Sequence, residues 1–94
     1  MKTLFEWDER KAKENLRKHK VSFAEAVTVF SDPLSVTISD PEHSTGEQRY
    51  IDLGTSDRNR VLVVVYTERA KAIRLISARK ATRAERKQYE EENS

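Results

Sequence analysis

Residues 61–66 read "VLVVVY", an apolar run that decides the fold of this chain. Because consecutive positions are apolar, the run predicts a strand with both faces covered, as in the middle of a sheet. A turn at "TSDRN" separates it from a strand at 48–54, and a tight turn at Arg69–Ala70 separates it from a strand at 72–78. Short turns join antiparallel neighbours, so we predict an antiparallel meander with residues 61–68 as its central strand.

Two helices are predicted before this meander. Residues 3–7 form a short strand by their aromatic content, and Asp8 then caps a basic helix over 8–20. Ser22 and Glu25 match a capping box that starts a second helix. Its apolar stripe follows the helical period and consists of Phe23, Ala26, Val27 and Phe30.

A further strand and a last helix complete the chain. The "SDP" at 31–33 ends the second helix, after which the apolar period becomes two, at Leu34, Val36 and Ile38. Thr82 and Glu85 form a second capping box for a helix over roughly 82–92, in which Tyr89 is the only sizeable apolar side chain. The predicted order is β-α-α-β-β-β-β-α, an α+β fold with a mainly antiparallel sheet covered by helices on one face.

The composition excludes several classes of function. Ninety-four residues suffice for a single core, and no apolar run is long enough for a signal peptide or a membrane span, so we expect one cytoplasmic domain over 1–94 with a frayed acidic tail at 90–94. Without cysteine there is no thiolate nucleophile or cysteine zinc site. His19 and His43 lie 24 positions apart with no spaced carboxylates, which predicts no metal and no cofactor.

Charge is segregated along the sequence. Residues 1–20 carry seven Lys/Arg against four Asp/Glu, residues 21–57 carry one against seven, and residues 58–94 carry ten against five. The segments therefore sum to +3, −6 and +5, giving the net charge of +2. This pattern is compatible with ordinary solvated charge or with a basic surface for a polyanion.

A cation cluster stands at the predicted start of the last helix. Arg79, Lys80 and Arg83 lie where the helix dipole favours negative charge. Something must offset this arrangement, and phosphate is a natural candidate because free helix N–H groups and cations together bind anions. The alternative is that Arg79 and Lys80 point into water.

Other candidate residues each have a structural alternative. Arg74, inside an apolar strand, either faces an active groove or pairs with an acidic residue such as Asp52 or Glu47. Arg49 is a candidate phosphate contact or a structural partner. His19 is a candidate acid or base, or a cation that stabilises a helix end. His43 lies in a loop where a catalytic group is hard to position.

Two aromatic residues are either RNA contacts or part of the core. Tyr66, at the end of the central strand, is a candidate for stacking on an RNA base, although core packing is the commoner role. Trp7 is expected to pack under the first helix.

Several stretches together resemble the BrnT toxins of bacterial type II toxin–antitoxin pairs. The similarity covers about residues 5–91 and includes "FEWDERKAKENLRKHKVSFAEAVTVFSDP", "GEQRYIDLG", "RVLVVVYTE" and "IRLISARKATRAERKQYEE". The resemblance implies a RelE-like fold, cleavage of RNA without a metal, and neutralisation by a ribbon-helix-helix antitoxin of the BrnA type, which also binds the promoter of the operon. One departure is Lys20, where many relatives carry glycine.

The sequence therefore predicts a metal-independent endoribonuclease, acting on mRNA, that inhibits translation. The alternatives are a weakly active partner of an antitoxin that acts as a transcriptional co-repressor, and a general RNA-binding domain. Promoter DNA would be contacted only through the antitoxin complex, and no membrane is involved. The proposed catalytic residues are Arg79, Lys80, Arg49, His19 and Arg74, and the proposed RNA-binding residues are Arg83, Tyr66 and Lys18.

Overall fold

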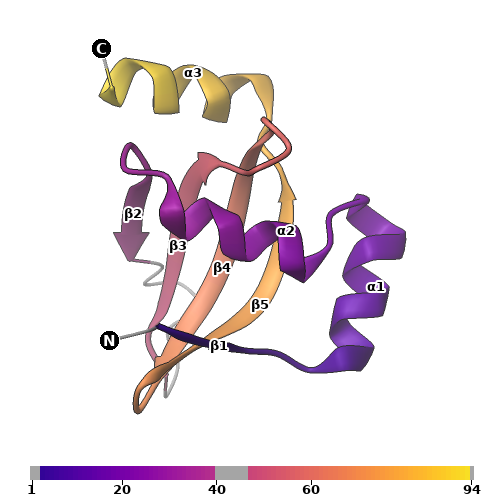
Figure 1. The fold of residues 1–94 in the computed structure, drawn as a ribbon. Coiled ribbons are helices and arrows are strands. Elements are labelled where there is room, and N and C mark those ends of the chain that lie inside the picture. Colours follow the sequence, from indigo (N-terminus) through magenta and orange to yellow (C-terminus); the bar gives the residue numbers. More distant parts are fainter. Residues whose placement is uncertain (1–2, 40–46, 94) are drawn as a thin grey trace.

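The computed structural model describes residues 3–39 and 47–93, which form a single sheet with helices around it (Figure 1). The elements follow the predicted order. They are β1 (Leu4–Glu6), α1 (Glu9–His19), α2 (Phe23–Val27), the 3-10 helix η1 (Thr28–Ser31), β2 (Val36–Ser39), β3 (Arg49–Thr55), β4 (Val61–Arg69), β5 (Ala72–Lys80) and α3 (Arg83–Glu92).

The sheet confirms the predicted meander. Its strand order is β1-β5-β4-β3-β2, with β4 in the centre. The pairs β2–β3, β3–β4 and β4–β5 are antiparallel, whereas β1 runs parallel to β5 along its first residues. Between β4 and β5 the register shifts, because Val65 pairs with Ser77 and Tyr66 pairs with Leu75. Ile76 is therefore an extra residue, as in a β-bulge.

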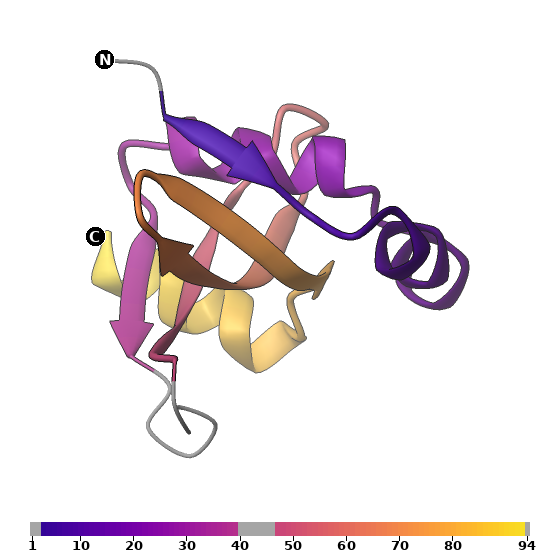
Figure 2. The same ribbon diagram turned by 90° about the horizontal axis from the view of Figure 1, so that it is seen from below.

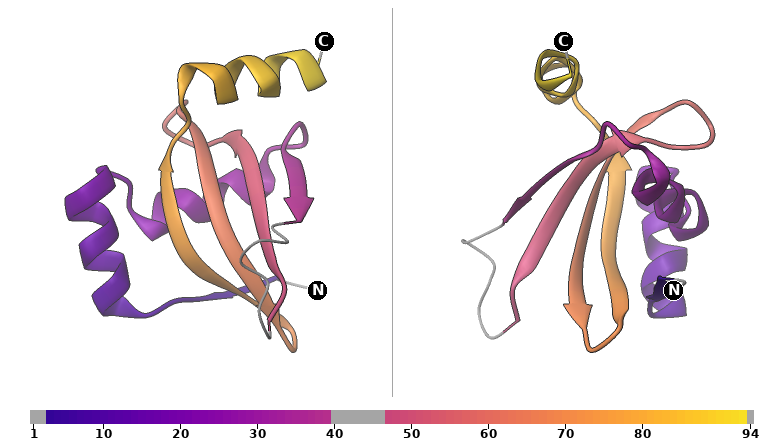
Figure 3. Two further views of the ribbon diagram at one scale, coloured as in Figure 1. Left: turned by 180° about the vertical axis from the view of Figure 1, so that it is seen from behind. Right: turned by 60° about the vertical axis from the view of Figure 1, so that its left-hand side comes forward.

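One side of the sheet, here called the closed face, carries the main core. It contains Leu62, Val64 and Tyr66 of β4. α2 lies across this face, and α1 stands beside the β5 edge of the sheet, as the views of Figures 2 and 3 show. The apolar stripe of the second helix packs here through Phe23 and Ala26, both almost fully buried. Trp7 also packs on this core, with its ring edge-on to Phe23 at a centroid distance of 5.9 Å.

The other side, the open face, carries Leu53 and Val63, and α3 contacts one end of it. Here the structure differs from the prediction that all helices lie on one face. Tyr89 packs against Leu53 and Val63, and its hydroxyl donates to Asp32 Oδ2 at 2.5 Å. Because Tyr89 is the one sizeable apolar side chain of α3, this helix covers only that end of the open face.

The predicted caps form at α1 and α3. Asp8 accepts from the backbone of Arg10 and Lys11, and Thr82 and Glu85 form a complete capping box. At α2 only half of the predicted capping box forms: Ser22 accepts from the Glu25 backbone N–H, but the Glu25 carboxylate accepts instead from Ser56 Oγ at 2.7 Å and forms a part-buried ion pair with Arg60.

The described part of the chain lacks two features. None of its helices is both long and apolar enough to cross a membrane. Within the same ranges, 3–39 and 47–93, no group of three His, Asp or Glu side chains is arranged to hold a metal ion.

Candidate functional site

The end of the open face away from α3 holds a cleft lined mainly by polar side chains. We call it the cationic cleft. The register of the sheet builds it, because Arg49 of β3 lies opposite Thr67 of β4, and Thr67 lies opposite Arg74 of β5. The cleft has a volume of about 130 Å³ and is lined by Lys11, Glu47, Arg49, Thr67, Arg69, Arg74 and Ile76.

A carboxylate lies among these cations. Glu47 accepts hydrogen bonds from Nε and Nη2 of Arg69 at 2.8 and 2.9 Å, and both side chains are about half exposed. These bonds hold the pKa of Glu47 below its usual range, and the positive charges of Arg69, Arg74 and Arg49 act in the same direction. Glu47 is therefore ionised at neutral pH and accessible to solvent.

Arg74 combines the two roles that the sequence left open. It lines the cleft, and its guanidinium also lies 3.7 Å from the carboxylate of Glu6 on β1. Asp52, one of the partners considered for it, is buried and instead accepts from Thr37 and Tyr66. A strand arginine is tolerated here because its side chain is partly exposed on the open face and lies near a carboxylate.

The cation cluster before α3 is offset from within the chain. Arg79 donates to both oxygens of Glu85, at 2.7 and 2.9 Å, while Glu85 also accepts from the Thr82 backbone N–H at 2.8 Å. The hydrogen bonds from Arg79 lower the pKa of Glu85 to about 2. The charge of Arg79 is thus balanced by a carboxylate at the helix start.

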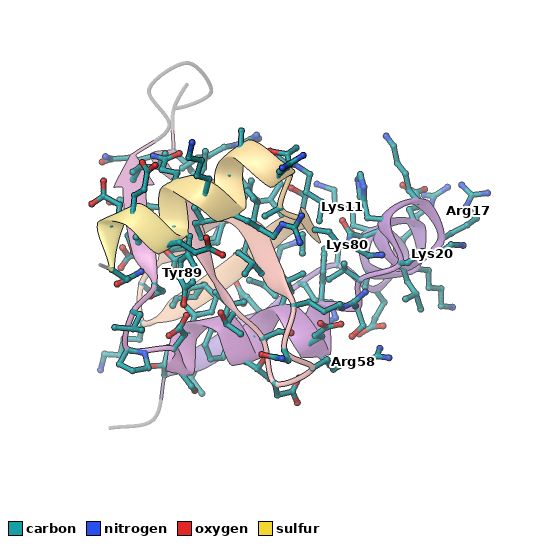
Figure 4. All side chains as sticks on the ribbon, turned by 90° about the horizontal axis from the view of Figure 1, so that it is seen from above. Lys11, Arg17, Lys20, Arg58, Lys80 and Tyr89 are labelled. Atoms are coloured by element: carbon teal, nitrogen blue, oxygen red, sulfur yellow. The ribbon has the colours of Figure 1, made fainter. Side chains whose placement is uncertain are left out.

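Arg79 lies apart from the cationic cleft. With Glu85 it lines an apolar depression of the open face next to α3, whose other lining residues are Val36, Ile38, Ile51, Leu53, Val63 and Gln88. Lys80 and Arg83 are exposed. In the view of Figure 4, Lys80 lies between α3 and the basic helix α1, on which Lys11 and Arg17 are labelled.

Two residues at the end of α1 lie beside the cleft. Lys18 and His19 line a depression between α1 and β5, together with Lys11 and Ile76, which also line the cationic cleft. The depression that holds Lys18 and His19 is therefore a neighbour of the cationic cleft. His43 falls outside the described residues.

Tyr66 needs correction as an RNA contact. Its side chain is 6% exposed and belongs to the core of the closed face. Its ring packs between Phe30 and Tyr50, at centroid distances of 4.9 and 5.6 Å, and its hydroxyl donates to Asp52 at 3.0 Å. Burial raises the pKa of this hydroxyl. Because its side chain is buried in this core, Tyr66 is unavailable for stacking on a base.

Three charged residues of the cleft were not selected as site residues from the sequence: Lys11, Glu47 and Arg69. The alternation of side chains along a strand indicates two of them. Glu47 is expected on the same strand face as Arg49, and Arg69 on the same face as Thr67. What the sequence does not give is the register that places these pairs opposite each other. Lys11 comes from α1, and its approach to the sheet is a tertiary contact.

Comparison with known proteins identifies a family and a similar fold. Residues 7–85 match the family model for the ribonuclease toxin, BrnT, of type II toxin–antitoxin systems. The crystal structure of the Brucella abortus ribonuclease toxin BrnT is similar in fold, with a TM-score of 0.65 and 22% sequence identity, over 87% of this chain and 100% of the other. A search among curated protein sequences found no match.

Proposed function

Because the chain belongs to the BrnT family of ribonuclease toxins of type II toxin–antitoxin systems, we propose that its cationic cleft cleaves mRNA without a metal ion. The observation that carries this proposal is the meeting of Arg49, Arg69 and Arg74 in one cleft with Lys11. Such cations stabilise the negative charge that develops on a phosphorus centre under attack. Guanidinium groups also match the geometry of phosphate oxygens.

The residues beside the cleft extend the proposed RNA site. Lys18 and His19 line the neighbouring depression along α1, where they contact the nucleotides next to the one that is cut. Lys80 and Arg83 contact RNA further along the strand through its phosphates. Arg79 contributes positive charge to that path but has a structural role first, since it holds Glu85 at the start of α3.

A type II toxin has an antitoxin partner, and we propose that this partner is a BrnA-type ribbon-helix-helix protein. Through it the complex contacts promoter DNA. The apolar depression beside α3 supports a protein partner, since Ile38 is 49% exposed there and aliphatic side chains offer little to RNA. A partner that covers this depression and extends over the cationic cleft on the same face blocks RNA. The toxin acts in the cytoplasm, where mRNA is translated.

The proposed activity is tested with purified protein, labelled single-stranded RNA and EDTA. Wild type is expected to cut the RNA, and Arg74→Ala to lower the rate by about 10²–10³-fold, since it removes one charge-stabilising donor. Arg58→Ala is the matched control, because Arg58 is 71% exposed on the β3–β4 turn and lies outside the cleft.

Three outcomes contradict the proposal. RNA that stays intact with the folded wild-type protein rules out a nuclease, and cleavage that requires added Mg²⁺ rules out the metal-independent reaction. Equal losses in Arg74→Ala and Arg58→Ala would place the activity outside the cationic cleft.

A further inference from the structure

Cleavage of RNA by its own 2′-hydroxyl requires a group that accepts the hydroxyl proton. Among the described residues that line the cationic cleft, Glu47 is the only carboxylate. The other lining groups are arginines and a lysine, which carry their protons at neutral pH, a threonine and an isoleucine. We propose, on the basis of the proposed ribonuclease function, that Glu47 is the general base of this cleft.

The position of Glu47 suits this task. Its carboxylate is fixed by the two hydrogen bonds from Arg69, yet its side chain remains 49% exposed, so a substrate hydroxyl reaches it. Arg49 and Arg74 line the same cleft. A phosphate bound by these two arginines brings its neighbouring 2′-hydroxyl to the carboxylate, which is how a base and a charge-stabilising group act on one reaction centre.

The reaction then proceeds with its protons accounted for. Glu47 takes the proton of the 2′-hydroxyl as the 2′-oxygen forms a bond to phosphorus and the bond from phosphorus to the 5′-oxygen breaks. Lys11, which lines the same cleft, protonates the leaving 5′-oxygen. The products are a 2′,3′-cyclic phosphate and a 5′-hydroxyl, and exchange with water returns Glu47 and Lys11 to their starting forms.

A second explanation must be separated from this one, namely that Glu47 only orients Arg69. The chain offers a matched control in Glu6, which pairs with Arg74 at 3.7 Å and has a similarly exposed side chain, but does not line the cleft. Glu6→Gln removes a carboxylate from the same group of cations while it leaves the proposed base in place. A purely orienting carboxylate leaves the pH dependence of the cleavage rate unchanged when it is replaced.

The experiment compares wild type, Glu47→Gln, Glu47→Asp and Glu6→Gln in single-turnover cleavage across a range of pH. Glu47→Gln is expected to lower the rate constant by about 10²–10⁴-fold and to lose the acidic limb of the pH profile, because that limb reports the base. Affinity for a substrate analogue with a 2′-deoxy residue at the cut site should be unchanged or higher. Glu47→Asp should keep part of the rate and an acidic limb, and Glu6→Gln should stay within about threefold of wild type.

The inference is overturned if Glu47→Gln keeps the wild-type rate constant, or if its rate falls while the acidic limb remains. A 5′-phosphate product would likewise overturn it, since that product comes from attack by water. If folded wild type leaves the RNA intact, the proposed ribonuclease function fails, and this outcome is distinguished from the others by the wild-type lane alone.

Discussion

The two faces of the sheet are built from alternate residues of the same strands, yet their environments differ sharply. On the closed face Leu62 and Val64 have no exposed surface, whereas on the open face Ile38 is 49% exposed. The polar groups differ in the same way. Asp52, on the closed face, is buried with fixed partners, while the Glu47–Arg69 pair in the cationic cleft is about half exposed.

The residues that stabilise the fold therefore lie mainly on the closed face, and the residues available to bind other molecules lie on the open face. Removing apolar surface from water supplies most of the favourable free energy of folding, and α1 and α2 provide that burial on the closed face. The open face contributes less burial, so its side chains are available to bind other molecules. Charged groups that stay near water lose little free energy when they change partners. The side chains of the cleft must change partners when a substrate phosphate binds.

The largest difference between the two faces is expected in the free energy of unfolding when an apolar side chain is truncated on each of them. Phe23→Ala, at a residue 2% exposed in the core of the closed face, should lower the free energy of unfolding by about 3–5 kcal/mol. Ile38→Ala on the open face should lower it by less than about 1 kcal/mol, because half of that side chain already contacts water. Urea unfolding measures both, and similar losses would contradict the distinction between the faces.

An intermediate effect is expected on acidification, at the polar attachment of α3. The pKa of Glu85 is about 2 in the folded protein against 4.5 for a free glutamate. Because the folded-state pKa is the lower one, the Arg79–Glu85 pair stabilises the fold fully above about pH 4.5, and this stabilisation is lost as the pH falls toward 2.

Glu85→Gln should therefore lower stability at neutral pH by about 1–2 kcal/mol, after allowance for solvent screening of this part-exposed pair, and by much less near pH 3. Urea unfolding at both pH values checks this, with the exposed Glu90→Gln on the same helix as control. Losses that are equal at the two pH values would show that the ion pair is not the cause.

The smallest effect is expected at Lys20, directly after α1, where the backbone conformation is unfavourable for a residue with a side chain. Lys20 follows α1 with a φ of 60°, a left-handed conformation that favours glycine. Lys20→Gly should raise the free energy of unfolding by about 0.5–1 kcal/mol, since it removes a steric cost that exceeds the added flexibility of the unfolded chain. Its backbone carbonyl, which accepts from Arg60, is retained.

Thermal unfolding measures this gain, and Lys18→Gly inside the same helix is the control, with an expected loss of about 1 kcal/mol. A destabilised Lys20→Gly would mean that the lysine side chain contributes more to the fold than its backbone conformation costs.

The fold was predictable because its signals are local. The apolar run at 61–66, the short turns beside it and the capping residues at Asp8 and Thr82 each specify structure within a few residues. The position of β1 was not predictable, because its parallel pairing with β5 joins residues such as Leu4 and Ala72 that are distant in sequence.

The arginines show why the site was harder to predict. Arg74 and Arg79 are an odd number of positions apart, so strict alternation along the strand places them on opposite faces. Both lie on the open face, because the extra residue Ile76 shifts the phase between them. Nothing in the residue types at this strand marks the bulge, and the grouping of cleft residues depends on it.

A last consequence follows from Asn15, a buried polar residue of α1. Its amide donates to the carbonyl of Ala78 at 2.8 Å and accepts from the Ala78 backbone N–H at 3.1 Å, as a residue on a neighbouring strand does. A helix side chain thus occupies the hydrogen-bonding groups of β5 beyond the point where β1 stops. The sheet edge at Ala78 is therefore closed to a strand from another chain without any strand of its own pairing there.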